Sequence, residues 1–323
     1  MNAAAALTES QRQRRRRWQR RREGALTALF ALAASLAVLV TLGMVMTLFS
    51  GAVGFLQRVG LVDYLFGLVW QPQIGMRADQ GLVEGQFGLL PLLGGSLLIT
   101  VLALLLALPI GLGAAVFLAE YATAGQRNRL KPLLELLAGI PTVVYGFFAA
   151  LVVAPLLHYL GGQLGIAVSA ESALACGLVV GVMIIPFVAS MADDALYAVP
   201  QAWRDAAIAL GATHAEMIRR TVLPAAFPGL ISACLIGFSK AIGQTMIVLM
   251  AGSLTANLTF NPLDGVSSMT AQIITLLSGD QEFASTATLS AFALALTLLI
   301  LALLTNTVGV SMNQRWRQRH GQN

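Results

Sequence analysis

The chain has 323 residues, of which 57% are hydrophobic and only 11% are charged, with a mean hydropathy of +0.77. Charged residues approach a quarter of a water-soluble domain, so this composition excludes one and indicates an all-α, polytopic membrane protein. The net charge of +5 reflects eight arginines between Arg12 and Arg22, which favours contact with membrane lipid over a nucleic-acid-binding function.

Six apolar runs are long enough to cross roughly 30 Å of hydrocarbon. The first, 25–50, follows a basic tail at 1–24 and is too long for a signal-peptide core. A polar segment at 51–92 precedes a core at 93–310, and a second basic tail, 311–323, ends the chain. We predict the five spans of this core near residues 93–119, 133–157, 173–191, 225–252 and 284–309.

Basic residues gather on one side of this arrangement. With both tails and the connectors around 119–133 and 193–224 in the cytoplasm, 17 of the 20 lysines and arginines lie on the cytoplasmic side. Arg58 and Arg77 lie outside, and Lys240 lies within a span. The positive-inside rule therefore predicts cytoplasmic termini and an external segment at 51–92.

The interval 193–224 is unusually polar for a stretch between two spans. Pro200 and Gly211 are placed to begin and end a short helix. Thr213 and Glu216 have capping-box spacing, which predicts a second short helix directly after the first. The small side chains of the first helix would let a partner's surface approach its backbone, although a passive interfacial helix has the same composition.

The spacing in this interval resembles the signature loop of ABC importer permeases, Glu-Ala-Ala, three residues, Gly, nine residues, then Ile-x-Leu-Pro. The matching residues are Ala206, Ala207, Gly211, Leu223 and Pro224, with Asp205 for the glutamate and Thr221 for the isoleucine. The resemblance implies a type I ABC importer permease fold, with a cytoplasmic coupling helix in the loop 193–224 that docks on a separate ATPase subunit.

No enzymatic activity is predicted for this chain. It contains no Walker, HExxH or GxSxG motif, so ATP and Mg²⁺ would be bound by the partner ATPase, and this chain would hold no cofactor. Cys176 and Cys234 lie in apolar runs, which indicates small core residues and no metal site.

Several further stretches resemble PstC-type phosphate permease subunits. They are FGLLPLLGGSLLIT (87–100), LAEYA (118–122), ELLAGIPTVVYGFFA (135–149), GVMIIPFVASMADDAL (181–196), and NPLDG (261–265) with the following SMTAQI. The resemblance implies a phosphate importer of the bacterial inner membrane, working by alternating access with a PstA-like second permease, an ABC ATPase dimer and a periplasmic phosphate-binding protein. Import of another tetrahedral oxyanion is the alternative. An intramembrane enzyme is less consistent, because Lys240 is the one charge predicted at mid-span.

Lys240 and Gln244 are predicted one helical turn apart, with Gly237 on the same stripe. A lysine near mid-bilayer costs at least about 2.5 kcal/mol, so it should face protein or water. We therefore predict a translocation path that includes Lys240, Gln244, Gly237 and Thr245, in which the cation meets an anionic substrate. The alternative is an ion pair within the bundle, with Glu135 as one candidate. PstC-type subunits typically have arginine and glutamate at the positions of Lys240 and Gln244.

Overall fold

The computed structural model describes residues 3–72, 85–278 and 285–319. The chain divides into two compact units, Met1–Gly51 and Ala52–Asn323. The first unit holds most of α1 (Ala3–Val59), a single helix of 57 residues. The arginine block and the first apolar run, which the sequence suggested as separate segments, therefore belong to one helix. Arginine is a good helix former, so the block does not interrupt it.

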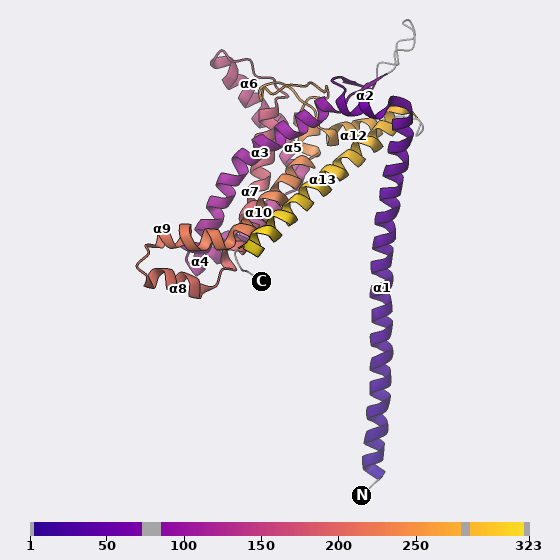
Figure 1. Ribbon diagram of the computed structural model, residues 1–323, viewed down its shortest axis with the longest axis vertical. Helices are drawn as coiled ribbons and strands as arrows, with labels where there is room; N and C mark the ends of the chain where they lie inside the picture. The colour runs from indigo at the N-terminus through magenta and orange to yellow at the C-terminus, as the bar shows by residue number, and fades with distance from the viewer. Residues whose placement is uncertain (1–2, 73–84, 279–284, 320–323) are drawn as a thin grey trace. The chain divides into compact units, whose positions relative to one another are not determined.

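The second unit is a bundle of α-helices (Figure 1). Its longer helices are α3 (Leu90–Val116), α7 (Ala173–Tyr197), α10 (Leu223–Ile242) and α13 (Thr286–Arg319). The shorter ones are α2 (Leu61–Phe66), α4 (Ala124–Ala138), α5 (Thr142–Phe148), α6 (Ala154–Gln163), α8 (Gln201–Ala209), α9 (His214–Met217), α11 (Met246–Ala251) and α12 (Met269–Leu277).

Three π-helical turns and one strand pair complete the described elements. The turn η2 (Phe117–Tyr121) extends α3, η3 (Ala149–Val153) joins α5 to α6, and η4 (Ile218–Val222) joins α9 to α10. The two-residue strands β1 (Trp70–Gln71) and β2 (Gln86–Phe87) pair antiparallel, with Trp70 opposite Phe87.

Within the described residues, six helical segments are long and apolar enough to cross a membrane. They are Leu26–Val59, Leu90–Tyr121, Thr142–Gln163, Ala173–Tyr197, His214–Ile242 and Thr286–Ser311. The prediction of an all-α fold with six spans is confirmed, and the strand pair is a small addition to it. The third and fifth spans differ most from the expected bounds, and the chain breaks near Pro141 and again after Ile242.

The first of these breaks lies in the run LAGIPTVVYGFF. Gly139 ends α4 and Pro141 is the N-cap of α5, so the third span begins at Thr142. Further along, a Cβ on Gly146 would lie 2.7 Å from Sδ of Met250. The glycine therefore permits close contact between α5 and α11.

The core of the second unit is formed by α3, α7 and α10, which pack against one another. Glycines bring α3 and α7 close together. A Cβ on Gly177 would lie 2.6 Å from Cβ of Leu102, and one on Gly181 would lie 2.9 Å from the carbonyl oxygen of Ala103. Small residues at helix interfaces let backbones approach without the loss of van der Waals contact.

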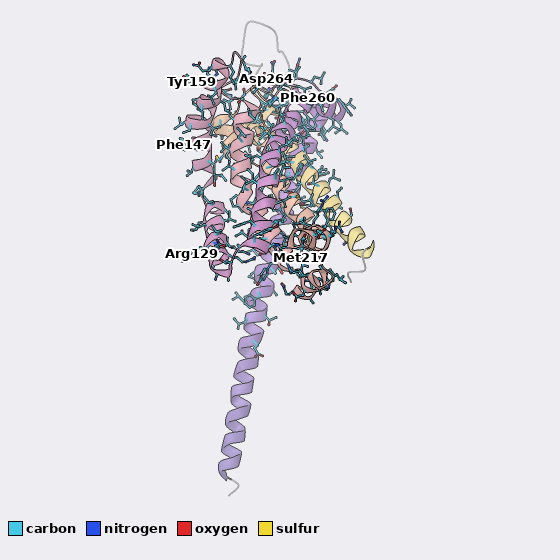
Figure 2. The ribbon with its side chains drawn as sticks, turned by 90° about the vertical axis from the view of Figure 1, so that its left-hand side faces the viewer. Arg129, Phe147, Tyr159, Met217, Phe260 and Asp264 are labelled. Carbon is cyan, nitrogen blue, oxygen red and sulfur yellow. The ribbon has the colours of Figure 1, made fainter. Side chains whose placement is uncertain are left out.

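The two ends of this bundle differ (Figures 1 and 2). At one end lie α4, which carries Arg129, and the pair α8 and α9, which includes Met217. At the other lie α6, which carries Tyr159, and the segment with Phe260 and Asp264. We call the first of these the α8–α9 end.

Candidate functional site

The first helix of the polar loop forms as the sequence predicts. Pro200 is the N-cap of α8, and Gly211 follows its C-cap with a φ of 88°. The amide of Gly211 donates to the carbonyl of Ile208 (2.9 Å), and the amide of Ala212 donates to the carbonyl of Ala207 (3.1 Å). This is a Schellman motif, which requires a left-handed residue. No atom lies within 4 Å of a Cβ built on Gly211, so the backbone conformation, and not packing, favours glycine there.

The second helix begins as expected but does not end as expected. The hydroxyl of Thr213 accepts from the amide of Glu216 (3.3 Å), and the amide of Thr213 donates to the Glu216 carboxylate (3.0 Å), which completes the capping box. However, α9 continues through η4 into α10, with Leu223 and Pro224 in the first turn of α10. The prediction of a separate second helix is therefore wrong. Proline is tolerated in a first turn, and the π turn carries the chain past it.

The outer face of α8 is exposed. Ala206 and Asp205 are exposed and Ala207 is half-buried. Asp205 accepts a hydrogen bond from Nε2 of Gln201 (3.1 Å), so its carboxylate lies along the helix surface. Two large apolar side chains share this helix and its end, Trp203 at 45% exposure and Leu210 at 90%. The helix thus presents small and apolar side chains to whatever lies outside the chain.

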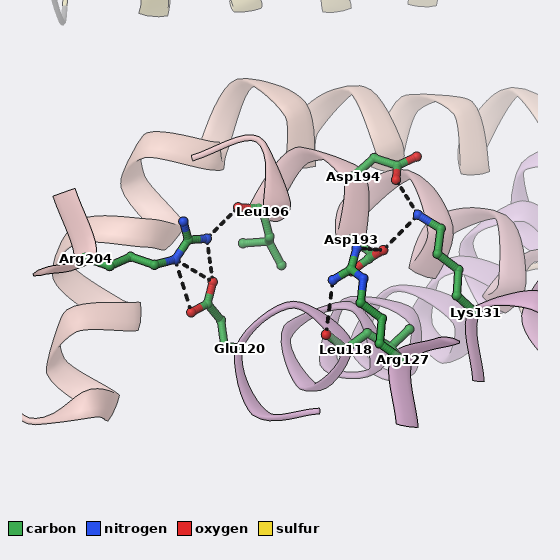
Figure 3. Close-up of polar contacts among 8 residues, drawn as sticks. All are labelled: Leu118, Glu120, Arg127, Lys131, Asp193, Asp194, Leu196 and Arg204. Carbon is green, nitrogen blue, oxygen red and sulfur yellow. Dashed lines mark hydrogen bonds and ion pairs between the residues drawn. The ribbon is translucent and has the colours of Figure 1, made fainter. Parts of the chain in front are cut away.

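The inner face of α8 is anchored by a charged residue (Figure 3). Arg204 is the one buried residue of α8, at 8% exposure. Its Nη2 lies 2.8 Å and its Nε 3.2 Å from Oε1 of Glu120, which lies in η2, 84 residues earlier in the chain. The same guanidinium donates to the carbonyls of Leu196 (2.8 Å) and Val199. One side chain therefore joins α8 to the end of α3 and to the end of α7.

A second ion cluster lies beside it (Figure 3). Oδ2 of Asp193 accepts from Nη2 of Arg127 (2.8 Å) and from Nζ of Lys131 (3.1 Å). Lys131 also lies 2.5 Å from Oδ1 of Asp194. The hydrogen bond with Asp194, and after it the contacts with Asp193, raise the pKa of Lys131 despite its partial burial. The other oxygen of Asp193, Oδ1, is buried without a hydrogen-bond partner.

This cluster revises two boundaries. Asp193, expected at the start of the polar loop, lies in α7, which continues to Tyr197, and its side chain is fully buried. Arg127 and Lys131, expected in a connector, lie on α4. Neither ion cluster was predicted as a site. The available signal was the position of the acidic residues Glu120, Asp193 and Asp194 directly after the ends of apolar runs, where a buried charge needs a partner.

The expected helical turn between Lys240 and Gln244 is absent. The helix α10 ends at Ile242, and Gln244 lies in the break before α11. The hydroxyl of Thr270 donates to the carbonyl of Gln244 (2.8 Å), which satisfies an acceptor that the interrupted helix leaves free. A broken helix inside a membrane protein needs such partners, because lipid offers none.

The predicted path residues occupy different environments. Lys240 is exposed, and its Nζ lies 3.5 Å from the centroid of the Phe187 ring. Among the described residues it forms no ion pair, and Glu135 is exposed elsewhere on α4. Gly237 is buried, and a Cβ there would lie 3.0 Å from Cγ2 of Val188, so in this chain it serves helix packing. Gln244 is buried and Thr245 is half-buried at the break.

The described residues contain no group of three or more His, Cys, Asp or Glu side chains placed to hold a metal ion. Cys176 is buried, Cys234 is half-buried, and both are free thiols. Two ion clusters thus lie at the α8–α9 end, and Lys240 lies apart from them, beside the helix break.

Comparison with known proteins places this arrangement in a family. Residues 107–318 match the family described as "Binding-protein-dependent transport system inner membrane component". The chain is 35% identical to the "Probable ABC transporter permease protein YqgH" of Bacillus subtilis, over 80% of this chain and 78% of that protein. It is 32% identical to the "Phosphate transport system permease protein PstC 1" of Mycobacterium bovis, over 72% of this chain and 74% of that protein.

Solved structures of ABC transporters have the same fold. An inward-facing form of the MetNI methionine ABC transporter matches with a TM-score of 0.52 at 19% identity, covering 71% of this chain and 94% of that one. A bacterial ABC transporter involved in the import of the polysaccharide alginate also matches with a TM-score of 0.52, at 16% identity, covering 70% of this chain and 78% of that one. The chain therefore belongs to the family of binding-protein-dependent transport system inner membrane components, as an ABC importer permease of the PstC type.

Proposed function

We propose that this chain is one of two permease subunits of an ATP-driven importer for inorganic phosphate, and that it forms the translocation path with a PstA-like second permease. The similarity to proteins named phosphate transport system permease protein PstC, at 30–32% identity over about three quarters of the chain, carries this proposal. A pair of ABC ATPases would bind ATP and Mg²⁺, and a periplasmic phosphate-binding protein would deliver the solute.

The outer face of α8 is proposed as the surface that docks on the ATPase. Exposed Ala206, Asp205 and Leu210, with half-buried Ala207, support this role, because a short helix with small side chains can enter a shallow groove. The Schellman motif at Gly211 then fixes where the helix stops, and Leu223 and Pro224 begin the span that receives its movement. Docking through α8 would place the α8–α9 end in the cytoplasm.

The charge distribution supports the same orientation. Arg127, Arg129 and Lys131 lie on α4, and Arg219 and Arg220 lie on η4, at the α8–α9 end. Under the positive-inside rule this end is cytoplasmic. The end of α13 lies beside it (Figure 1), so the C-terminus would be cytoplasmic as well, and the protein would be a multi-pass component of the bacterial inner membrane.

The exposed cation beside the helix break is proposed to line the translocation path. Lys240 lies on a membrane-spanning helix without an anionic partner among the described residues, so its charge needs water or a neighbouring subunit. A discontinuous span near such a charge is typical of transporter substrate sites, where free backbone groups face the solute. Thr245, whose hydroxyl donates to the carbonyl of Gly243 (3.3 Å), and Gln244 would lie beside the passing anion, and Gly237 would let the helices approach.

Uptake by the whole complex tests the proposal. The chain is expressed with a PstA-like permease, an ABC ATPase and a phosphate-binding protein from the same organism, in a bacterial host that lacks its own high-affinity phosphate uptake. We expect ATP-dependent accumulation of labelled phosphate that excess unlabelled phosphate abolishes. Accumulation of labelled sulfate or molybdate in place of phosphate would assign the chain to another tetrahedral oxyanion and reject phosphate as the substrate.

A further inference from the structure

The nine-residue helix α8 is held to the membrane core by very little apolar surface. Its side chains are exposed or half-buried, apart from that of Arg204. The helix packs on α9 and η4, which are its neighbours in sequence. Ala207 adds a small apolar contact with the core at this end, and the polar link of α8 to the second span and to the end of the fourth span is the Arg204 guanidinium.

The chemistry of that link is specific to arginine. Nε and Nη2 both donate to the Glu120 carboxylate, while Nη2 and Nη1 also donate to the carbonyls of Leu196 and Val199. These two carbonyls lie at the C-terminal end of α7, where acceptors lack partners within the helix and the helix dipole favours a cation. A planar guanidinium has five donors in a fixed arrangement and can join all three groups. Lysine, with a single ammonium, cannot reproduce this geometry.

The link is also shielded from water. The side chains of Arg204 and Glu120 are only 9% and 3% exposed. Salt screens such a pair much less than a surface pair, and a water molecule has little access to replace either partner. The two residues are 84 positions apart, so the pair fixes α8 to a distant part of the chain.

We propose that Arg204, with Glu120 as its counter-ion, is the positioning residue that makes α8 move as one body with α3 and α7. The inference rests on the proposed function of α8 as the helix that docks on the ATPase. Closure of the ATPases displaces α8, and the displacement reaches the spans only if α8 cannot shift against them. A rigid link converts that displacement into rotation of the spans, as in other domain movements that transmit force through a packed interface.

The primary test measures the distance between α8 and α3 in the assembled complex. Spin labels are attached at cysteines replacing exposed Ala209 on α8 and Gly113 on α3, in a chain whose Cys176 and Cys234 are replaced by alanine. With Arg204 present, we expect one narrow distance distribution, the same without nucleotide and with ATP trapped. In Arg204→Gln the distribution should broaden or shift when ATP is trapped. An unchanged, narrow distribution in that variant would overturn the proposal.

The functional readout is phosphate uptake per ATP hydrolysed. We expect Arg204→Gln to lower this ratio by at least about tenfold while ATP hydrolysis continues, and Arg204→Lys to lower it less. Arg129→Gln is the matched control, because Arg129 is exposed on α4 at the same end of the bundle (Figure 2) and should leave the ratio unchanged. Failure of both Arg204 variants to assemble would assign the pair to stability alone and overturn the proposal.

A covalent substitute for the ion pair gives an independent outcome. In Glu120→Cys/Arg204→Cys, a short bifunctional thiol reagent should restore much of the uptake per ATP that the uncrosslinked variant loses. A crosslinked complex that hydrolyses ATP without transport would mean that the two positions must separate during the cycle, which contradicts the proposal. The distance measurement needs no transported solute, so a wild-type complex that takes up no phosphate would reject the proposed function and leave this test intact.

Discussion

Arg127 and Asp193, which are 66 residues apart, meet at 2.8 Å at the α8–α9 end, and only one oxygen of the aspartate takes part. Oδ2 also accepts from Lys131, while Oδ1 is buried without a partner. Arg127 further donates to the carbonyl of Leu118 (3.2 Å) and lies over the ring of Tyr197, 4.2 Å from its centroid. The pair therefore fastens α4 to α7 and to the end of α3.

Asp193→Ala should destabilise the protein much more than Asp194→Ala. The Asp193 side chain is fully buried, and its removal leaves two cations without their shared anion, a change that typically costs about 3–5 kcal/mol. The Asp194 side chain is 60% exposed, and a pair of that kind contributes about 0–1 kcal/mol. Thermal melting of the detergent-solubilised protein measures both, and equal shifts in melting temperature would contradict the assignment.

The contribution of Lys131 to stability, measured by the same thermal melting, has a defined pH dependence. The raised pKa of Lys131 means that its contribution to stability is present below the ordinary lysine pKa and is lost only as pH rises past the raised value. The extra destabilisation of a Lys131→Met variant should therefore be constant from about pH 6 to about pH 9. A difference that vanishes within that range would show that another group titrates in the cluster.

Gly211→Asp should disrupt docking of the ATPase, whereas Gly211→Asn should largely preserve it. Both side chains have the same shape, both are tolerated in the left-handed conformation, and no atom would lie within 4 Å of the new Cβ. Only aspartate adds a charge next to the docking face. Co-purification of the ATPase with each variant, together with phosphate uptake, measures the effect. Equal retention of the ATPase by the two variants would remove this face from the interface.

Lys240→Gln should lower phosphate uptake by at least about tenfold, the factor that corresponds to 1.4 kcal/mol, in a complex that still assembles. Glutamine keeps a polar, helix-compatible side chain but removes the charge that would attract the anion. Lys240→Arg should retain much of the uptake. Full uptake by a well-assembled Lys240→Gln complex would exclude Lys240 from the path.

The ring of Phe187 should influence how strongly Lys240 interacts with phosphate. A cation over an aromatic face is stabilised by about 0.5–2 kcal/mol, depending on how far it is desolvated. Phe187→Leu removes the ring, whose centroid lies 3.5 Å from Nζ of Lys240, and keeps an apolar side chain. We expect a change in the phosphate concentration that gives half-maximal uptake, with little effect on the amount of assembled complex. Val182→Leu, at an exposed position on the same helix, is the matched control.

The reaction of introduced cysteines with an impermeant maleimide tests the orientation of the chain in the membrane. Leu164, 74% exposed at the end of α6, and Leu210, 90% exposed after α8, mark opposite ends of the bundle. In a chain without native cysteines, Leu164→Cys should react in intact cells, and Leu210→Cys should react only after permeabilisation. Labelling of Leu210→Cys in intact cells would place the α8–α9 end outside and contradict the model of ATPase docking.

Local chemistry explains what the sequence predicted well. Long apolar runs identified six spans because a bilayer sets the length of a helix that crosses it. Pro200 and Gly211 predicted the start and end of α8, and the pair Thr213 and Glu216 predicted the start of α9, because capping depends on residues only a few positions apart.

The features that the sequence did not predict depend on contacts between residues far apart in the chain. The partnership of Glu120 with Arg204 depends on how α3 and α8 are rotated relative to each other, and neither rotation is visible in either segment alone. The break after Ile242 was missed for a similar reason, because the hydroxyl that supports it comes from Thr270, 26 residues beyond Gln244, whose carbonyl it binds. A single glycine in an apolar run does not by itself predict such a break.

The π turn at the end of α3 determines the direction of a charge as well as the length of a span. In η2 the amide of Ala122 donates to the carbonyl of Phe117, five residues back, so this turn holds one residue more than an α-helical turn would. Since each residue of an α-helix rotates the side-chain direction by about 100°, removal of that extra residue would turn Glu120 away from Arg204 while leaving a continuous apolar helix above it. A variant that lacks Ala119 should therefore insert normally into the membrane but transport like a variant without the ion pair. Normal uptake by this variant would show that the direction of the Glu120 side chain is unimportant. The extra residue thus separates two requirements that a regular helix would couple: how far the second span reaches and which way its final charge points.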